Sequence, residues 1–242
     1  MTFAIAILNH NGSVLLKRFL SKVIENCQDA QIYIIDNKSS DDSIDFISKN
    51  HPEINIIELN ANYGYAEGYN EGVKLIAEDV IIFLNNDAVF LDKQSYNQIY
   101  KTFNSNDNIS IAQPRIIDYN NRNKYEYAGA SGGYIDLLGY PFCRGRIINN
   151  VESAEKYRTT REIFWASGAC FVIRRKTFNK LNGFDNDFFC HMEEIDLCWR
   201  LKNIDNDKKI VTIGKSQVFH IGGGTMQYDN PNKNYLNFRN SI

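Results

Sequence analysis

The chain has 242 residues, of which 43% are hydrophobic, so it is long and apolar enough for one α/β domain with a substantial core. Its 27 basic and 29 acidic residues give a net charge of −2 without any basic run, which argues against nucleic acid as a partner. Five scattered cysteines without metal-binding spacing favour reduced thiols in a cytoplasmic protein, and no apolar run reaches the ~20 residues that cross a bilayer.

Strands and helices are predicted to alternate through the first half of the chain. The apolar run at 80–84 does not alternate with polar residues, which is typical of a strand buried on both faces. This order predicts βαβ units in an α/β fold, a Rossmann-like and mostly parallel sheet with helices on both faces. Further strands are predicted at 3–8, 31–35, 54–59 and 109–113, and helices begin near 13 and 43 and run over about 66–77 and 92–103.

Polar residues follow four of the predicted strands in turn: Asn9, Asp36, the pair Asn60 and Asn62, and Asp87. Each of them alone is an ordinary turn or cap residue. Together they predict a ligand rim, because ligands of open α/β sheets bind beyond the carboxyl ends of the strands. A carboxylate such as Asp36 can accept the imide N–H of a pyrimidine base, and Asp87 offers a hard oxygen ligand to Mg²⁺ or Mn²⁺.

Gly64, Gly68 and Gly72 are spaced four residues apart, and two interpretations of them stay open. Small residues at this spacing let a helix pack closely on a sheet. Alternatively, Gly64 opens a turn after which the backbone N–H groups of a helix start face a phosphate. The glycine fingerprint of a dinucleotide-binding turn is absent after the first strand.

The second half of the chain is less regular. Residues 119–160 form a long segment without periodicity, which predicts a functional loop, and a buried strand is predicted to end at 174. A helix over about 191–201 begins with Glu193 and Glu194, either as first-turn carboxylates favoured by the helix dipole or with one of them raised in pKa to act as a base. His220 follows a late strand predicted at 209–213 and is either a structural histidine or a ligand.

Five signatures occur in order along the chain, at 7–12, 35–41, 62–70, 83–87 and 193–197. Together they resemble the family 2 glycosyltransferases, the GT-A group of inverting enzymes with nucleotide-sugar donors, and within it the rhamnosyltransferase-like branch. The resemblance implies a single GT-A domain over 1–242, with a nucleotide-binding half at about 1–114 and an acceptor and catalytic half at about 115–242.

The resemblance also implies the metal ligands and the base. Asp87 matches the last carboxylate of the family's DxD motif, which holds Mg²⁺ or Mn²⁺ on the diphosphate, and His220 matches a late histidine that can complete the metal site. Asn85 stands where the first DxD carboxylate would be. Glu194 matches the catalytic base, which is usually Asp in the family.

Further contacts are implied by the same comparison, with Asp36 on the nucleotide base. Nucleotide-binding residues are expected at Asn9, Asp36, Asn62, Gly64, Asn70 and Asn86, and the donor–acceptor junction is expected at Trp165, Ser167, Gly168, Asp185 and Glu193.

The expected function is transfer of a sugar from a UDP- or dTDP-linked donor to a hydroxyl of a glycan or lipid-linked acceptor in polysaccharide biosynthesis. A catalytically silent nucleotide-sugar binding module and a sugar nucleotidyltransferase are the alternatives, although the second lacks a basic, Gly-rich loop after the first strand. Since the chain stops where a helix opens, we expect a missing C-terminal segment that contacts the inner face of the cell membrane peripherally.

Overall fold

The computed structural model describes residues 1–126, 129–147, 150–222 and 231–241. The helices are α1 (Ser13–Asn26), α2 (Ser43–Asn50), α3 (Ala66–Val73), α4 (Lys93–Ser105), α5 (Arg175–Lys180), α6 (Glu193–Ile204), α7 (Pro231–Asn240) and a 3-10 turn, η1 (Asn186–Phe188). The strands are β1 (Phe3–Asn9), β2 (Ala30–Asp36), β3 (Asn55–Glu58), β4 (Val80–Leu84), β5 (Ala88–Val89), β6 (Ile109–Asp118), β7 (Gly133–Ile135), β8 (Pro141–Cys143), β9 (Arg146–Ile147), β10 (Asn150–Val151), β11 (Arg161–Glu162), β12 (Cys170–Arg174) and β13 (Lys209–His220).

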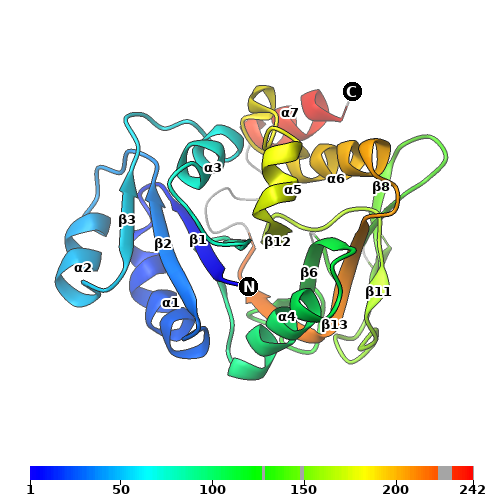
Figure 1. Cartoon of the computed structure of the whole chain (residues 1–242), viewed down its shortest axis with the longest axis horizontal. Helices are drawn as coiled ribbons and strands as arrows, with labels where there is room; N and C mark the ends of the chain where they lie inside the picture. Colours follow the sequence, from blue (N-terminus) through cyan, green and yellow to red (C-terminus); the bar gives the residue numbers. More distant parts are fainter. Residues whose placement is uncertain (127–128, 148–149, 223–230, 242) are drawn as a thin grey trace.

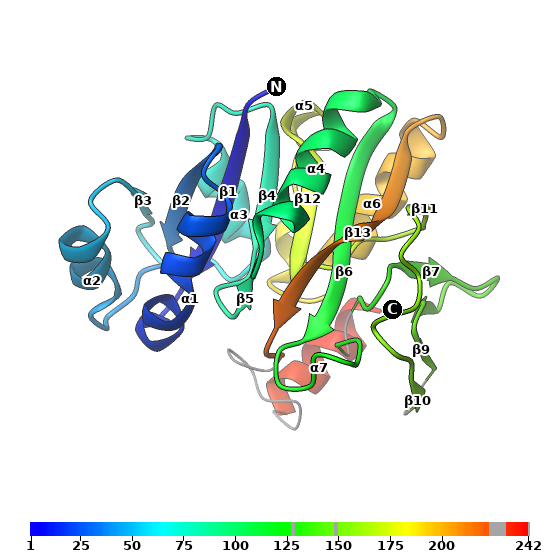
Figure 2. The same ribbon diagram turned by 90° about the horizontal axis from the view of Figure 1, so that it is seen from below.

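One mixed sheet of nine strands forms the centre of the molecule, in the order β11-β13-β6-β12-β4-β1-β2-β3 with β5 paired to β13 (Figures 1 and 2). β1 runs parallel to β2 and β4, and β2 runs parallel to β3. β12 is antiparallel to both β4 and β6, so β6 points the same way as β4, and β13 is parallel to β6. The carboxyl ends of β1, β2, β3, β4, β6 and β13 therefore meet at one edge, which we call the ligand edge.

Helices cover both faces of the sheet, as predicted (Figure 1). The apolar side chains of α1, α2 and α4 join one buried cluster with β1 and β4, and those of α3, α5 and α6 join a second cluster on the other face. All five residues of β4 are buried because the strand lies between these two clusters, which confirms the doubly buried strand expected at 80–84. Within the described residues, no helix has the length and apolarity needed to span a membrane.

Two strands are longer than the sequence pattern indicates. β6 has 10 residues and β13 has 12, whereas the expected strands covered only 109–113 and 209–213. Pro114 interrupts the apolar pattern of β6, and the register of β13 shifts between Ile213 and Gln217 opposite that proline, which is how a sheet accommodates a bulge. As a result β13 extends to His220, at the ligand edge. α3 ends at Val73, earlier than expected, and α5 and β11 were not predicted.

Candidate active site

A pocket of about 360 Å³ lies at the ligand edge beyond the ends of β2 and β3. Asp36, the last residue of β2, is 4% exposed, and its carboxylate accepts hydrogen bonds from Ser39 N (2.9 Å) and Asn9 Nδ2 (3.3 Å). A carboxylate offers about four lone-pair positions, so Asp36 retains the capacity to accept a further N–H from a ligand. The residues that line the 360 Å³ pocket include Asp36, Lys38, Ser39, Asp41, Glu58 and Asn60.

A chain of amides connects this pocket to the end of β4. Asn9 is fully buried, and its Oδ1 accepts a hydrogen bond from Asn86 Nδ2 (3.4 Å) while its own Nδ2 donates to Asp36. The structure thus brings together Asn9, Asp36 and Asn86, three residues expected to bind the nucleotide, and Asn86 directly precedes Asp87 in the chain.

The start of α3 contacts a protein loop. Asn62 Oδ1 accepts from Gly64 N (3.0 Å), and Gly64 has a φ of +74°. A Cβ at Gly64 would lie 2.5 Å from the ring of Phe189 and 2.7 Å from its carbonyl oxygen. That oxygen accepts the N–H groups of Tyr65 (2.7 Å) and Ala66 (3.2 Å). These first amides of the helix therefore bond to Phe189. Gly64 packs against this loop, whereas Gly68 and Gly72 lie against Leu8 of β1 and Ile35 of β2, which is the close packing of helix on sheet that the glycine spacing predicts.

Two other expected ligand contacts hold a turn in this structure. Asn70 donates from Nδ2 to Phe184 O (2.7 Å) and accepts from Phe184 N at Oδ1 (2.9 Å), so both ends of its amide are engaged. Asp185 is exposed and caps η1 by accepting from Asp187 N (3.0 Å). Asn70 and Asp185 thus stabilise the segment that leads to α6, which is a packing role that sequence spacing does not reveal.

Asp87 and His220 come together as the resemblance implies. β5 pairs with the end of β13, with Ala88 opposite His220, and this pairing sets His220 Nε2 at 2.9 Å from Asp87 Oδ1. His220 Nδ1 lies 3.5 Å from Glu126 Oε2, and all three side chains are buried. Burial lowers the pKa of His220, but the hydrogen bonds and charges of Asp87 and Glu126 outweigh it and raise the pKa to about 10.

The Asp87–His220 pair can take a divalent cation in exchange for the proton that the imidazole carries, because a metal binds the neutral ring. Two neighbouring ligands of an octahedral ion at 2.0–2.1 Å lie ~3 Å apart, close to the separation of Oδ1 and Nε2. Glu126 contacts the other ring nitrogen, in the manner of a carboxylate that orients a metal-binding histidine. In the described ranges, no group of three or more His, Cys, Asp or Glu side chains is arranged to hold a metal ion, so Asp87 and His220 would supply only part of its coordination.

Glu193 and Glu194 open α6 as a hydrogen-bonded pair. Glu193 is 3% exposed, and burial and the charge of Glu194 raise its pKa well above the ordinary range. Burial also raises the pKa of Glu194, whose carboxylate accepts a hydrogen bond from the Gly168 backbone. Oε2 of each glutamate is buried and has no hydrogen-bond partner among the described residues. A hydrogen bond between two carboxyl groups needs a proton on one of them, and the pKa directions place that proton on Glu193, which donates to Glu194.

The segment 165–169 connects this carboxylate pair to the end of β4. Gly168 O accepts from Tyr65 Oη (2.9 Å), and Ala169 O accepts from Asn85 N (3.1 Å), two residues before Asp87. Ser167 N donates to Gln113 Oε1 (2.8 Å), and Trp165 Nε1 donates to the Tyr134 carbonyl (3.0 Å). Gly168 thus lies beside Glu194, whereas Trp165 is 5% exposed and packs into the core.

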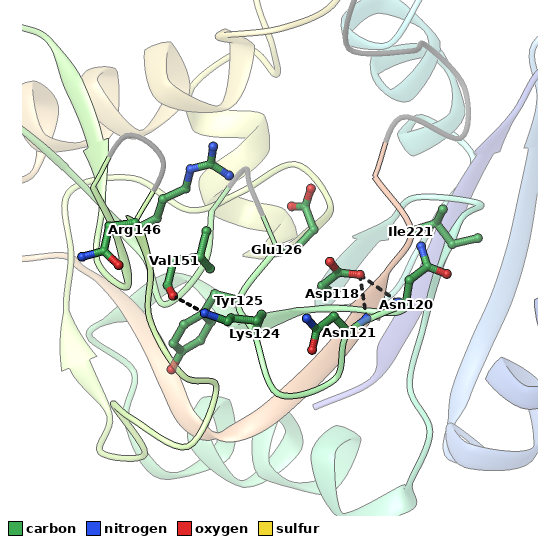
Figure 3. A pocket seen from close by; sticks show the side chains of 10 residues that line it. Asp118, Asn120, Asn121, Lys124, Tyr125, Glu126, Arg146, Val151 and Ile221 are labelled. Carbon is green, nitrogen blue, oxygen red and sulfur yellow. Dashed lines mark hydrogen bonds between the residues drawn. The ribbon is translucent and has the colours of Figure 1, made fainter.

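A second pocket, of about 670 Å³, adjoins the Asp87–His220 pair through Glu126 (Figure 3). In it Lys124 Nζ donates to Val151 O (3.0 Å), and Asp118 accepts the backbone N–H groups of two following asparagines. Sequence reasoning missed Glu126 and Asp118 because they lie in or beside the aperiodic segment, where no pattern marks them. The residues that line the 670 Å³ pocket include Asp118, Asn121, Lys124, Glu126, Arg146 and Ile221.

Comparisons with known proteins agree with this geometry. Residues 4–181 match the profile described as "Glycosyl transferase family 2". The chain is 24% identical over 98% of its length to a low-salt glycan biosynthesis hexosyltransferase of Haloferax volcanii, and 24% identical over 77% of its length to an N-acetylglucosaminyl-diphospho-decaprenol L-rhamnosyltransferase of Mycobacterium tuberculosis. It spans 73% and 66% of those proteins, respectively.

Solved structures show the same fold at low identity. GalNAc-T7, solved with UDP, GalNAc and Mn²⁺, superposes with a TM-score of 0.72 at 17% identity over 91% of this chain and 44% of that one. A mannosyltransferase of Pyrobaculum calidifontis, solved with GDP-Man and Mn²⁺, has a TM-score of 0.63 at 12% identity over 90% of this chain and 56% of that one. With the GT-A fold shown by these neighbours and the family by the profile, the chain belongs to the glycosyltransferases of family 2.

Proposed function

We propose that this protein is an inverting transferase that moves a sugar from a UDP- or dTDP-linked donor to a hydroxyl of a glycan or lipid-linked acceptor. One observation carries the proposal: the Glu193–Glu194 pair and the Asp87–His220 pair are connected through the 168–169 backbone at the same sheet edge as the Asp36 pocket. A base, a cation site and a nucleotide pocket are the three parts that such a transfer needs.

The donor nucleotide occupies the Asp36 pocket in this proposal. Asp36 accepts the N3–H of uracil or thymine, a donor that guanine presents at a different position on a larger ring. The amides of Asn9 and Asn86 continue from the pocket toward Asp87, along the direction in which the diphosphate would extend. Of the structural neighbours, one was solved with UDP and another with GDP-Man, so the fold accommodates either base and the choice depends on side chains.

Glu194 removes the proton from the acceptor hydroxyl as that oxygen attacks the anomeric carbon and the bond to the nucleoside diphosphate breaks. The hydrogen bond from the Gly168 backbone orients the carboxylate, and the hydrogen bond with Glu193 supports it. The raised pKa, caused by burial, makes Glu194 a stronger base than an exposed glutamate. A Mg²⁺ or Mn²⁺ ion held by Asp87 and His220 would neutralise the charge that develops on the leaving diphosphate.

The acceptor lies in the 670 Å³ pocket in this proposal. Its carboxylates, amides and two cationic side chains suit sugar hydroxyls, which both donate and accept hydrogen bonds. The mycobacterial relative is named for an acceptor in which a sugar is joined to a lipid through a diphosphate, and Arg146 and Lys124 are the cations in this pocket that could face such a group.

Ligand binding and donor turnover test the proposal. UDP or dTDP with Mn²⁺ should raise the melting temperature more than GDP or ADP, because a ligand that binds the native state stabilises it. Asp36→Ala should abolish that preference. Donor hydrolysis should require Mn²⁺ and release the nucleoside diphosphate. Equal stabilisation by all four nucleotides would refute the base assignment, and tight donor binding without hydrolysis or transfer would indicate a silent binding module.

A further inference from the structure

The turn at 187–192, directly before α6, has a strained backbone. Phe189 has φ 59° and ψ −61°, and the N–H of Cys190 donates to the carbonyl of Phe188 (2.6 Å), which is the rare form of the γ-turn. His191 and Met192 follow with φ values of 72° and 74°. Non-glycine residues adopt positive φ infrequently, and several of them in one turn persist only where surrounding contacts enforce them.

Asn240, the last residue of α7, supplies such contacts from one side. Its Nδ2 lies within hydrogen-bond distance of three backbone carbonyl oxygens, those of Phe188 (3.0 Å), Cys190 (2.9 Å) and His191 (2.7 Å). These acceptors lie around the strained residues, so one side-chain amide bridges most of the turn. Although 49 or more residues separate Asn240 from them in sequence, α7 brings it to this turn.

Arg239 adds to this clamp and orients the amide. Its Nη2 donates to the carbonyls of Asp187 (2.7 Å) and Phe188 (2.9 Å), and its Nε donates to Asn240 Oδ1 (2.8 Å). Because a guanidinium only donates, the Nε bond requires an oxygen at that position of Asn240 and leaves the NH₂ group facing the turn. Two neighbouring side chains thus act as one unit.

From the other side, the start of α3 holds the centre of the turn, because the carbonyl of Phe189 accepts the N–H groups of Tyr65 and Ala66. The exit of the turn is Met192, whose carbonyl accepts the N–H groups of Ile195 (3.1 Å) and Asp196 (3.0 Å). These are the first hydrogen bonds of α6, so the conformation of Met192 sets the direction in which the first turn of the helix presents its side chains.

We propose that Arg239 and Asn240 are positioning residues for catalysis: by holding the strained 187–192 turn, they set Glu193 and Glu194 for proton removal from the acceptor. The inference rests on the proposed function, since it assigns the clamp a role in the transfer step. The hydrogen bonds of both side chains to the turn go to its backbone carbonyls, so the clamp acts on the two glutamates through the backbone.

Asn240→Asp is the sharpest test, because it keeps the size of the side chain but sets a carboxylate against three carbonyl oxygens. We expect kcat for transfer to fall about 10²-fold, the loss associated with a displacement of ~1 Å in a reacting geometry. The KM for the donor and the affinity for UDP with Mn²⁺ should stay within about twofold. Amide hydrogen exchange over 187–194 should become faster, because the clamp no longer closes the turn.

Ser241→Ala is the matched control, since the Ser241 hydroxyl donates to the carbonyls of Asn237 and Phe238 within α7 itself. It should leave both kcat and exchange unchanged. Arg239→Lys is the second variant, which keeps the charge but loses the fork and should give a smaller loss of kcat. An unchanged kcat in Asn240→Asp, or an equal loss of kcat and UDP affinity in it, would overturn the proposal.

A variant that does not fold and a parent protein that is inactive lead to different conclusions. If Asn240→Asp does not fold, Arg239→Lys decides, and an unchanged kcat there overturns the proposal. If the parent protein shows no transfer and no hydrolysis with any donor, the proposed function fails, and the catalytic role of the clamp fails with it. Hydrogen exchange would then still show whether α7 holds the turn.

Discussion

Replacing Glu194 with glutamine separates catalysis from structure most clearly. The side chain keeps its size, and its amide oxygen can still accept the hydrogen bond from the Gly168 backbone. In the variant, the NH₂ group of the glutamine can donate to the carboxylate of Glu193, so the hydrogen bond between the two side chains is kept. The site geometry is therefore retained, while the group that accepts the proton is lost, because an amide is not a base at neutral pH.

The expected loss falls on kcat. General-base catalysis contributes about 10²–10⁴-fold, or ~2.7–5.5 kcal/mol of transition-state stabilisation at 1.36 kcal/mol for each factor of ten. Binding of UDP with Mn²⁺ should not change, since Glu194 belongs to α6 and not to the Asp36 pocket. The assay is transfer from the donor under single turnover, with nucleotide affinity measured separately.

The pH dependence adds an independent check. The pKa of Glu194 is raised by burial, so transfer should increase as pH rises through this value and Glu194→Gln should lose that dependence. The free energy of unfolding should change with pH in the opposite direction to the rate of transfer. A carboxyl whose pKa in the folded state is above its ordinary value of 4.5 favours the folded state while protonated. The parent should therefore lose stability relative to Glu194→Gln as pH rises above about 4.5 and until that raised pKa is passed.

Glu193→Gln is the matched control for this prediction. It removes the neighbouring carboxylate but leaves Glu194 as the base, so its loss of kcat should be clearly smaller. If Glu193→Gln abolished transfer and Glu194→Gln did not, the two roles would be exchanged. If both variants transferred at the parent rate, the pair would be structural and the base assignment would be refuted.

Two further predictions concern the cation pair and the start of α3. Glu126→Gln should weaken Mn²⁺-dependent binding of UDP about 10–100-fold, because it removes the carboxylate that orients His220. Titration with Mn²⁺ in the presence of UDP measures this loss. An unchanged Mn²⁺ dependence would contradict the role of Glu126 in orienting His220. Gly64→Ala should destabilise the protein by about 2–5 kcal/mol, because an alanine in the left-handed conformation costs ~1–2 kcal/mol and the contact of its Cβ with Phe189 adds ~1–3 kcal/mol. Denaturant unfolding measures the change in the free energy of unfolding. A change below about 1 kcal/mol would show that Phe189 moves aside without loss of stability.

Local pattern determined the frame of this protein. The unbroken apolar run of β4 predicted a strand buried on both faces, and the structure places it between two core clusters. The polar residues after β1, β2 and β4 could be assigned to one edge because parallel strands end on the same side of a sheet. Asn9 and Asp36 meet there, as their places at neighbouring strand ends predict, whereas the contact of Asn9 with Asn86 is visible only in the structure.

Tertiary structure alone decided the details of the site. The extension of β13 to His220 depends on pairing with β6 and β5, across a bulge opposite Pro114 that hides the strand in the sequence. Glu126 reaches His220 from a segment without periodicity. Asn240 lies 49 residues or more from the carbonyls that it binds, and the strain at Phe189 is visible only as a backbone angle. Short-range patterns report burial and chain direction, whereas contacts between distant segments depend on packing that no single window of sequence contains.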